Sequence, residues 1–253
     1  MASPSEPSLA HLNGGYAIDK CYKIVQTILN ENHYGTLSPA RFNLLAFYAQ
    51  QSIFSEAINF IKKTKMKDSR RRADKDFLKL YQEALAGLYI RDKELTEETE
   101  DVFGETRIVY LKENDIAYVD SVICLNSDGS IREAEVVHIN SDIGLTGHLM
   151  SPTEAFPIAI DKRDKYEVLP DTISSVYLYY YRYPKAPKWT YINSNNQPVF
   201  SVTDNLQDFE LGVELLDDII LHILQMAGVH LKRADVVQYT ENEEAYKDKQ
   251  ELQ

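Results

Sequence analysis

The sequence predicts an α+β fold in which terminal helices pack as a bundle and an antiparallel β module is inserted between them. Three observations lead to this prediction. Apolar residues recur at helical spacing near both ends of the chain, and the period changes to two in the middle. Within the middle part, Asp128-Gly129 is a tight-turn signal between two alternating segments.

Three helices are expected before the β module. The first runs from about Ile18 to Asn32. The second begins after Ser38, a good N-cap, with Pro39 at the first helical position, where its missing N–H costs nothing. The third is expected from about Asp74 to Ile90.

Strands are expected from Thr106 onward. The turn at Asp128-Gly129 joins segments 118–125 and 131–139, and the aromatic run from Ser175 to Tyr183 is strongly β-prone. Shorter strands are expected near 156–160, 166–168, 189–191 and 199–202. Helix returns from Phe209 to Ala227, and Asp235 is the expected cap of a last, acidic helix.

These elements predict four regions. They are a flexible N-terminal arm at 1–15, helices of the bundle at 16–105, a β-rich insert at 106–203, and closing helices at 204–253. The arm lacks the cationic start and apolar run of a signal peptide, and no apolar stretch is long enough to span a membrane. Synthesis in a reducing cytoplasm is expected, with Cys21 and Cys124 as buried free thiols.

No catalytic, metal or cofactor site is predicted. The chain has neither a GxxxxGK[ST] phosphate loop, nor GxGxxG, nor a GxSxG nucleophile elbow. Its six histidines form no HxxxH pair, and neither cysteine has a CxxC partner. The sequence therefore favours a protein that is not an enzyme.

Two runs of opposite charge are candidate protein interfaces. The basic run comprises Lys62, Lys63, Lys65, Lys67, Arg70, Arg71, Arg72 and Lys75. The acidic run includes Glu97, Glu98, Glu100 and Asp101. The basic run is either a solvated loop or one half of a contact with the acidic run of another copy. Nucleic-acid binding is disfavoured, because the net charge is −12.

A second acidic set flanks the apolar face of the helix expected from Phe209 to Ala227. It consists of Glu210, Glu214, Asp217 and Asp218. These carboxylates either line a channel, where they would repel passing DNA, or keep an outer surface soluble. The tyrosine-rich strand is likewise open to two interpretations: a sheet or protein interface, or a stacking platform for sugars or bases.

Three segments resemble neck proteins of tailed bacteriophages. Residues 37–50 (LSPARFNLLAFYAQ), with the helix before them, resemble the opening of virion structural proteins in crAss-like and related phages. Residues 209–231 and 233–239 resemble the closing helices of head–tail connector proteins, and 183–189 (YPKAPKW) also resembles this group. The segment between Thr106 and Pro170 has no counterpart, so its role stays open.

The resemblance implies a virion protein that joins the portal to the tail and leaves a channel for DNA. Its partners would be copies of itself in a ring, typically of twelve, together with the portal and tail or further neck proteins. DNA would pass without specific binding, and no membrane is involved. Another tail or neck adaptor is the first alternative. A carbohydrate-binding module or an enzyme with a scattered site is an alternative of a different class.

Overall fold

The computed structural model describes residues 15–31, 35–67, 72–102, 105–138, 151–195 and 197–228. These residues fall into two compact units. The sheet unit comprises Glu56–Lys185 and Glu210–Gly212. The helical unit comprises the described parts of 15–55 and 213–228 together with Ala186–Phe209.

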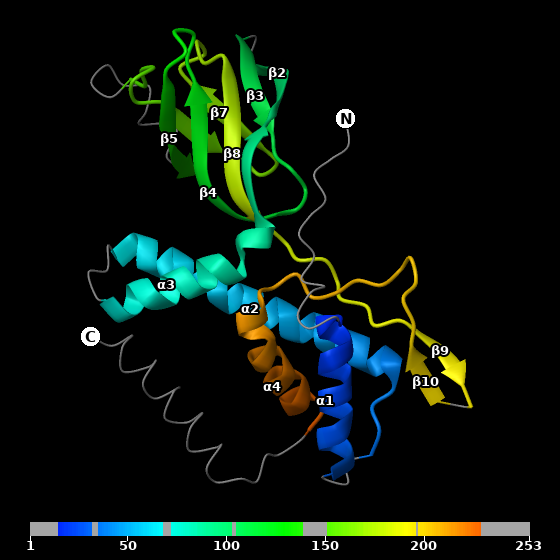
Figure 1. The fold of residues 1–253 in the computed structure, drawn as a ribbon. Helices are drawn as coiled ribbons and strands as arrows, with labels where there is room; N and C mark the ends of the chain where they lie inside the picture. The colour runs from blue at the N-terminus through cyan, green and yellow to red at the C-terminus, as the bar shows by residue number, and fades with distance from the viewer. Residues whose placement is uncertain are drawn as a thin grey trace. The chain divides into compact units, whose positions relative to one another are not determined.

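An eight-stranded mixed sheet dominates the sheet unit (Figure 1). Its spatial order is β1-β8-β4-β5-β6-β7-β3-β2. The strands are β1 (Tyr89–Glu94), β2 (Thr96–Val102), β3 (Glu105–Leu111), β4 (Ile116–Leu125), β5 (Ile131–His138), β6 (Ile158–Asp161), β7 (Lys165–Leu169) and β8 (Ser175–Arg182). Neighbours are antiparallel except β5 and β6, which run parallel.

The sheet is strongly curled, and its two edge strands, β1 and β2, follow each other directly in the chain. β1 pairs with β8 and β2 pairs with β3, yet only Leu95 separates β1 from β2. The Leu95 N–H donates to the Val176 carbonyl at 2.9 Å, which holds this corner against β8. A sheet that curls in this way leaves less free edge for unwanted strand pairing.

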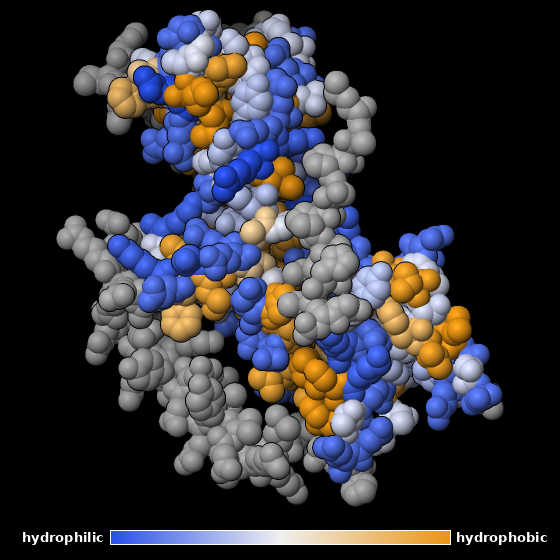
Figure 2. Space-filling model, viewed as in Figure 1, coloured by the Kyte–Doolittle hydropathy of each residue, from blue (hydrophilic) through white to orange (hydrophobic). Residues whose placement is uncertain are grey.

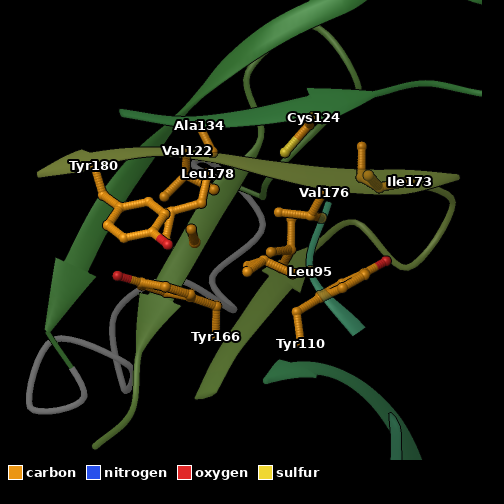
Figure 3. Packing of buried hydrophobic residues seen from close by; sticks show 12 residues of the cluster. Leu95, Tyr110, Val122, Cys124, Ala134, Tyr166, Ile173, Val176, Leu178 and Tyr180 are labelled. Carbon is orange, nitrogen blue, oxygen red and sulfur yellow. The ribbon is translucent and has the colours of Figure 1, made fainter. Parts of the chain in front are cut away.

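The concave side of the sheet encloses its core. Alternate residues of β8, namely Val176, Leu178 and Tyr180, point inward, as the period-two pattern requires. Figure 3 shows them packed with Tyr110 and Tyr166 from the strands opposite. The other members of this core are Leu95, Val122, Cys124, Ala134, Ala159, Val168 and Ile173.

Helices also belong to the sheet unit. The later part of α2 (Pro39–Lys67) and α3 (Arg72–Ala84) contribute Phe60, Phe77 and Tyr81, whose rings pack together. The centroids of Phe60 and Tyr81 are 5.2 Å apart. A single 3₁₀ turn, Ala86–Leu88, then leads into β1.

The helical unit contains α1 (Ala17–Glu31), the first part of α2, and α4 (Leu216–Met226), which follows a 3₁₀ turn at Val213–Leu215. Figure 1 shows α1 and α4 side by side. Ile18, Phe42 and Ile223 are fully buried here. The unit also contains a two-stranded hairpin, β9 (Tyr191–Ser194) and β10 (Gln197–Phe200).

The predicted fold class is wrong: the described helices do not form a bundle of terminal helices, and a sheet dominates the molecule. The sheet is also mixed rather than purely antiparallel. The cause lies in residues 89–102, which are predicted as the end of a helix and an acidic stretch but form β1 and β2. Most side chains of β2 are exposed, so this strand carries no alternating apolar signal.

Several local predictions are confirmed. The Ser38 Oγ accepts a hydrogen bond from the Arg41 N–H, and Pro39 begins α2. The hairpin at Asp128-Gly129 and the tyrosine-rich strand also form as expected. The expected helix after Asp235 lies outside the described residues. The division into an arm, bundle helices, an insert and closing helices stays a prediction.

Candidate functional site

The hairpin of β9 and β10 exposes apolar side chains. Ile192 and Val199 face each other across the two strands, and 56% and 47% of their surfaces are exposed. Tyr191 and Val202 are exposed as well. From Trp189 to Thr203 the chain contains no charged residue. Figure 2 shows apolar residues gathered on this hairpin. Depletion of charge around exposed aliphatic and aromatic residues is typical of the centre of a protein interface.

The base of the hairpin is fixed firmly to the helical unit by Trp189. Its indole Nε1 donates to the Asp19 Oδ1 at 3.1 Å, and its ring stacks on Tyr22 with centroids 4.0 Å apart. The Asn43 amide makes two further bonds to the Trp189 backbone, at 2.8 and 3.1 Å. Because these partners come from α1 and α2, the exposed strands extend from a rigid base.

Asp208 closes the hairpin segment against α1. Its carboxylate accepts hydrogen bonds from the N–H groups of Ala17 and Ile18, at 2.9 and 2.8 Å. These are the first N–H groups of α1, which have no partner within the helix. A carboxylate at this end is also favoured by the helix dipole. The start of α1 is thus bound to the segment that follows β10, although the two are far apart in the sequence.

A second surface without charge lies on α2. Phe42, Ala46, Ala49, Ile53 and Ala57 form its buried stripe. Leu44 lies about 180° and Tyr48 about 140° around the helix from the middle of that stripe, at about 100° per residue. They are 53% and 54% exposed. No charged residue occurs between Phe42 and Ser55, so Leu44 and Tyr48 are followed on the outward side by uncharged Gln51, Ser52 and Ser55, and exposed Arg41 lies one turn before Leu44.

The described members of the basic run lie at the end of α2 and in α3. Lys65 pairs with Asp120 of β4, and the Lys62 ammonium lies 4.8 Å from the centre of the Tyr118 ring. Lys63 is exposed on the same helix. The side chains of Lys67 and Arg72 are not described, and Arg70 and Arg71 lie outside the described residues. Lys62 and Lys65 thus contact the sheet of their own copy.

The acidic run forms strand β2. Glu97, Glu98 and Asp101 are exposed, and Glu100 pairs with Lys165 of β7 at 2.9 Å. Hydrogen bonding to Lys165 holds the pKa of Glu100 below its usual value. Lys65 pairs with Asp120 and Glu100 pairs with Lys165, so these two members of the opposite runs bind other partners within their own copy.

The acids expected to face a channel divide into two kinds. Glu214, Asp217 and Asp218 are exposed, on the 3₁₀ turn and the first turn of α4. Glu210 instead accepts two parallel hydrogen bonds from Arg182, at 2.9 and 3.0 Å. Burial raises its pKa, but bonds from Arg182 and the Lys185 N–H outweigh this and leave it below the usual value. Glu210 therefore contributes little unpaired charge to any surface.

A hollow of about 980 Å³ opens beside β4 and the loop after β6 in the sheet unit. Its lining includes Tyr118 and Tyr166, whose pKa values are raised by burial, so both phenols stay protonated at neutral pH. Cations and acids are balanced along it: Lys62, Lys65, Lys112 and Arg163 against Glu113, Asp120, Asp161 and Asp164. Such a lining does not concentrate charge of either sign. The inward tyrosine of β8, Tyr180, belongs to the core, which agrees with the first interpretation of that strand.

Within the described ranges, no three His, Cys, Asp or Glu residues are grouped as metal ligands. The same residues include no helix that is long and apolar enough to cross a membrane. The exposed faces of the hairpin and of α2 are not among the surfaces predicted from the sequence. The signal that would have found them is the pair of charge-free runs, 42–55 and 189–203, in a chain with 26% charged residues.

Comparisons with known proteins give no family. The sequence matches no protein-family model, and its comparison with curated proteins yields no significant match.

Proposed function

We propose that this chain is a non-enzymatic virion protein, a head–tail connector subunit whose copies form a ring between the portal and the tail. The observation that carries the proposal is the rigidly based hairpin with the exposed pair Ile192 and Val199. The proposal places the protein in the neck of the virion after synthesis in the cytoplasm of a bacterial host.

The physics of the hairpin supports an assembly role. An isolated two-stranded hairpin is marginally stable in water, and its free edges invite pairing. Here the two strands carry exposed aliphatic residues and no charge that would discourage association. The base of the hairpin is held by hydrogen bonds from Trp189 to Asp19 and between Trp189 and Asn43, which costs side-chain conformational entropy. Such a feature is useful to a subunit that must present a preformed contact to its neighbour.

The resemblance to neck proteins concerns the same part of the molecule. Residues 37–50 form the start of α2, which bears Leu44 and Tyr48. Residues 183–189 lead directly into the hairpin and end at Trp189. The segment from Phe209 onward supplies α4, which packs beside α1. The sequence likeness and the exposed surfaces therefore support the same proposal.

The charge of the chain suits a channel that carries DNA without binding it. The net charge is −12, and like charge repels the phosphate backbone. In the proposed ring, Glu214, Asp217 and Asp218 face either the channel or the outside. Glu210 is excluded from that choice because Arg182 neutralises it.

Purified particles of the virus that encodes the chain test the proposal. We expect peptides of this chain in the virion at a fixed ratio to the portal, and antibody labelling confined to the neck. Absence from particles, or labelling of fibres or capsid faces, would contradict it. A monomer that binds a glycan would favour the alternative of a carbohydrate-binding module.

A further inference from the structure

We propose that the outer face of the hairpin of one copy packs against the charge-free outer face of α2 of the next copy. The occupant of the hairpin is thus a second copy of this chain. The inference rests on the proposed ring and names the two surfaces that build it. Its central residues are Ile192 and Val199 on one side and Leu44 and Tyr48 on the other.

The two surfaces do not cover each other within one copy. All four residues remain about half exposed in the single chain, although both surfaces belong to the helical unit. On α2, Asn43 binds the base of the hairpin, whereas Leu44 and Tyr48 lie on the side away from the buried stripe. One chain therefore presents two different exposed apolar surfaces at the same time. Contact between unlike surfaces of identical copies propagates from copy to copy and closes into a ring if the rotation allows it.

The chemistry of the two surfaces matches. Each has an apolar centre. Burying one centre against the other removes apolar surface from water and does not bury an unpaired charge between Ile192 and Leu44. The hairpin has an uncharged polar border, and α2 has one on the C-terminal side of Tyr48, whereas exposed Arg41 lies one helical turn before Leu44. Asn193, Ser194, Asn195 and Gln197 surround the hairpin pair, and Gln51, Ser52 and Ser55 follow Tyr48 along α2. Amide and hydroxyl groups of this kind can exchange hydrogen bonds at the rim, where water also enters.

The size of the contact favours a ring over a dimer. A stable pair of proteins normally buries about 800 Å² on each partner. The hairpin pair is much smaller, so a single contact would be weak. In a closed ring each copy uses both surfaces, and the last contact forms between parts that are already held together. We therefore expect assembly to be cooperative, with little isolated dimer.

A charge-swap experiment tests the pairing in the full-length chain, with the portal added if the wild-type chain needs it to assemble. Ile192→Asp and Leu44→Lys should each reduce the ring fraction at least tenfold, because each places one charge in an apolar contact. The double variant Ile192→Asp with Leu44→Lys should recover much of the ring, and more at low salt, because each contact then joins opposite charges. Ile131→Asp is the matched control, since Ile131 is an exposed aliphatic residue on β5 of the sheet unit. Circular dichroism should show that every variant is folded.

Cross-linking decides the partner directly. When Ile192→Cys and Tyr48→Cys chains are mixed and oxidised, the mixed disulfide should exceed both homodimers. Dominant Ile192→Cys homodimers would show that hairpins pair with each other, and cross-links only to the portal would show a different occupant. Either result would overturn the inference while leaving the connector proposal intact. A wild-type chain that forms no ring alone or with the portal would overturn both.

Discussion

The indole N–H of Trp189 donates a hydrogen bond to the Asp19 carboxylate at 3.1 Å, and both residues are buried. Asp19 lies in the first turn of α1, whereas Trp189 precedes the exposed hairpin. The same carboxylate also pairs with Lys23 at 2.6 Å, which keeps its charge compensated. Together with the Tyr22 ring and the Asn43 amide, this contact fixes the base of the proposed assembly surface to the helices of its unit.

We predict that Asp19→Ala weakens this anchor. The substitution leaves a buried indole N–H without an acceptor, which costs about 1–3 kcal/mol. Trp189 is the single tryptophan of the chain, so its fluorescence during urea unfolding reports on this site. Asp19→Asn keeps an acceptor oxygen and should cost less. Asp217→Ala, at an exposed position of α4, should change little. Equal stability of Asp19→Ala and wild type would show that the contact does not hold the base.

The Arg182–Glu210 pair should stabilise the sheet unit. Hydrogen bonds to charged groups contribute about 1.5–3 kcal/mol, so we expect Glu210→Gln to lower the free energy of unfolding by about 2 kcal/mol at pH 7. The control is Glu214→Gln, because Glu214 is exposed nearby in the chain. Thermal or urea unfolding followed by circular dichroism measures both. A smaller effect for Glu210→Gln than for Glu214→Gln would refute the pair's role.

The same pair predicts a pH dependence. The folded-state pKa of Glu210 is lowered from the ordinary value of 4.5, so its contribution to stability is complete above that pH and is lost as pH falls below it. Glu210→Gln has no carboxylate to protonate. The stability difference between wild type and variant should therefore shrink as the pH is lowered below about 4.5. A difference that grows on acidification would contradict this assignment.

Both cysteines should be unreactive in the folded chain. Burial raises the pKa of Cys21 to about 12, with a smaller effect from Asp208, and burial raises that of Cys124 to about 11. Because the thiolate is the reactive form, a thiol reagent at pH 8 should modify neither group until the protein is denatured. Two equivalents should then react. Fast labelling under native conditions would show that one of the two sites opens.

The basic segment should assist assembly. Replacing Arg70, Arg71 and Arg72 with Glu should reduce the ring fraction, and the loss should be larger at low salt, where surface charges are less screened. The expected partner is the acidic β2 of another copy, which carries exposed Glu97, Glu98 and Asp101. Asp101→Lys with Glu98→Lys should then partly restore assembly. If the arginine substitutions leave assembly unchanged, the basic segment is solvent-exposed and makes no contact between copies.

Part of this structure could be predicted from the sequence because its signals are local. Pro39 after Ser38 marks the start of α2, and Asp128-Gly129 marks the turn from β4 to β5. The alternation along β8 reflects a strand with one face in the core. In each case the residues that carry the signal also form the element.

The remainder depends on contacts between distant residues. β2 forms because β3 offers it backbone partners, and its exposed acids give no sign of this pairing. Asp208 caps α1 from far along the chain, and Arg182 selects Glu210 out of four acids that look equivalent in sequence. The exposure of the hairpin likewise depends on the folded unit. Charge-free runs are a weak signal of an exposed apolar surface, because a buried segment also lacks charge.

Electron cryo-microscopy of the full-length chain, alone and mixed with the portal of its virus, tests the central claim most directly. We expect closed rings with a single copy number, in which the hairpin of each subunit contacts its neighbour. Particles that remain monomeric under both conditions, or rings in which Ile192 and Val199 stay exposed to solvent, would contradict it.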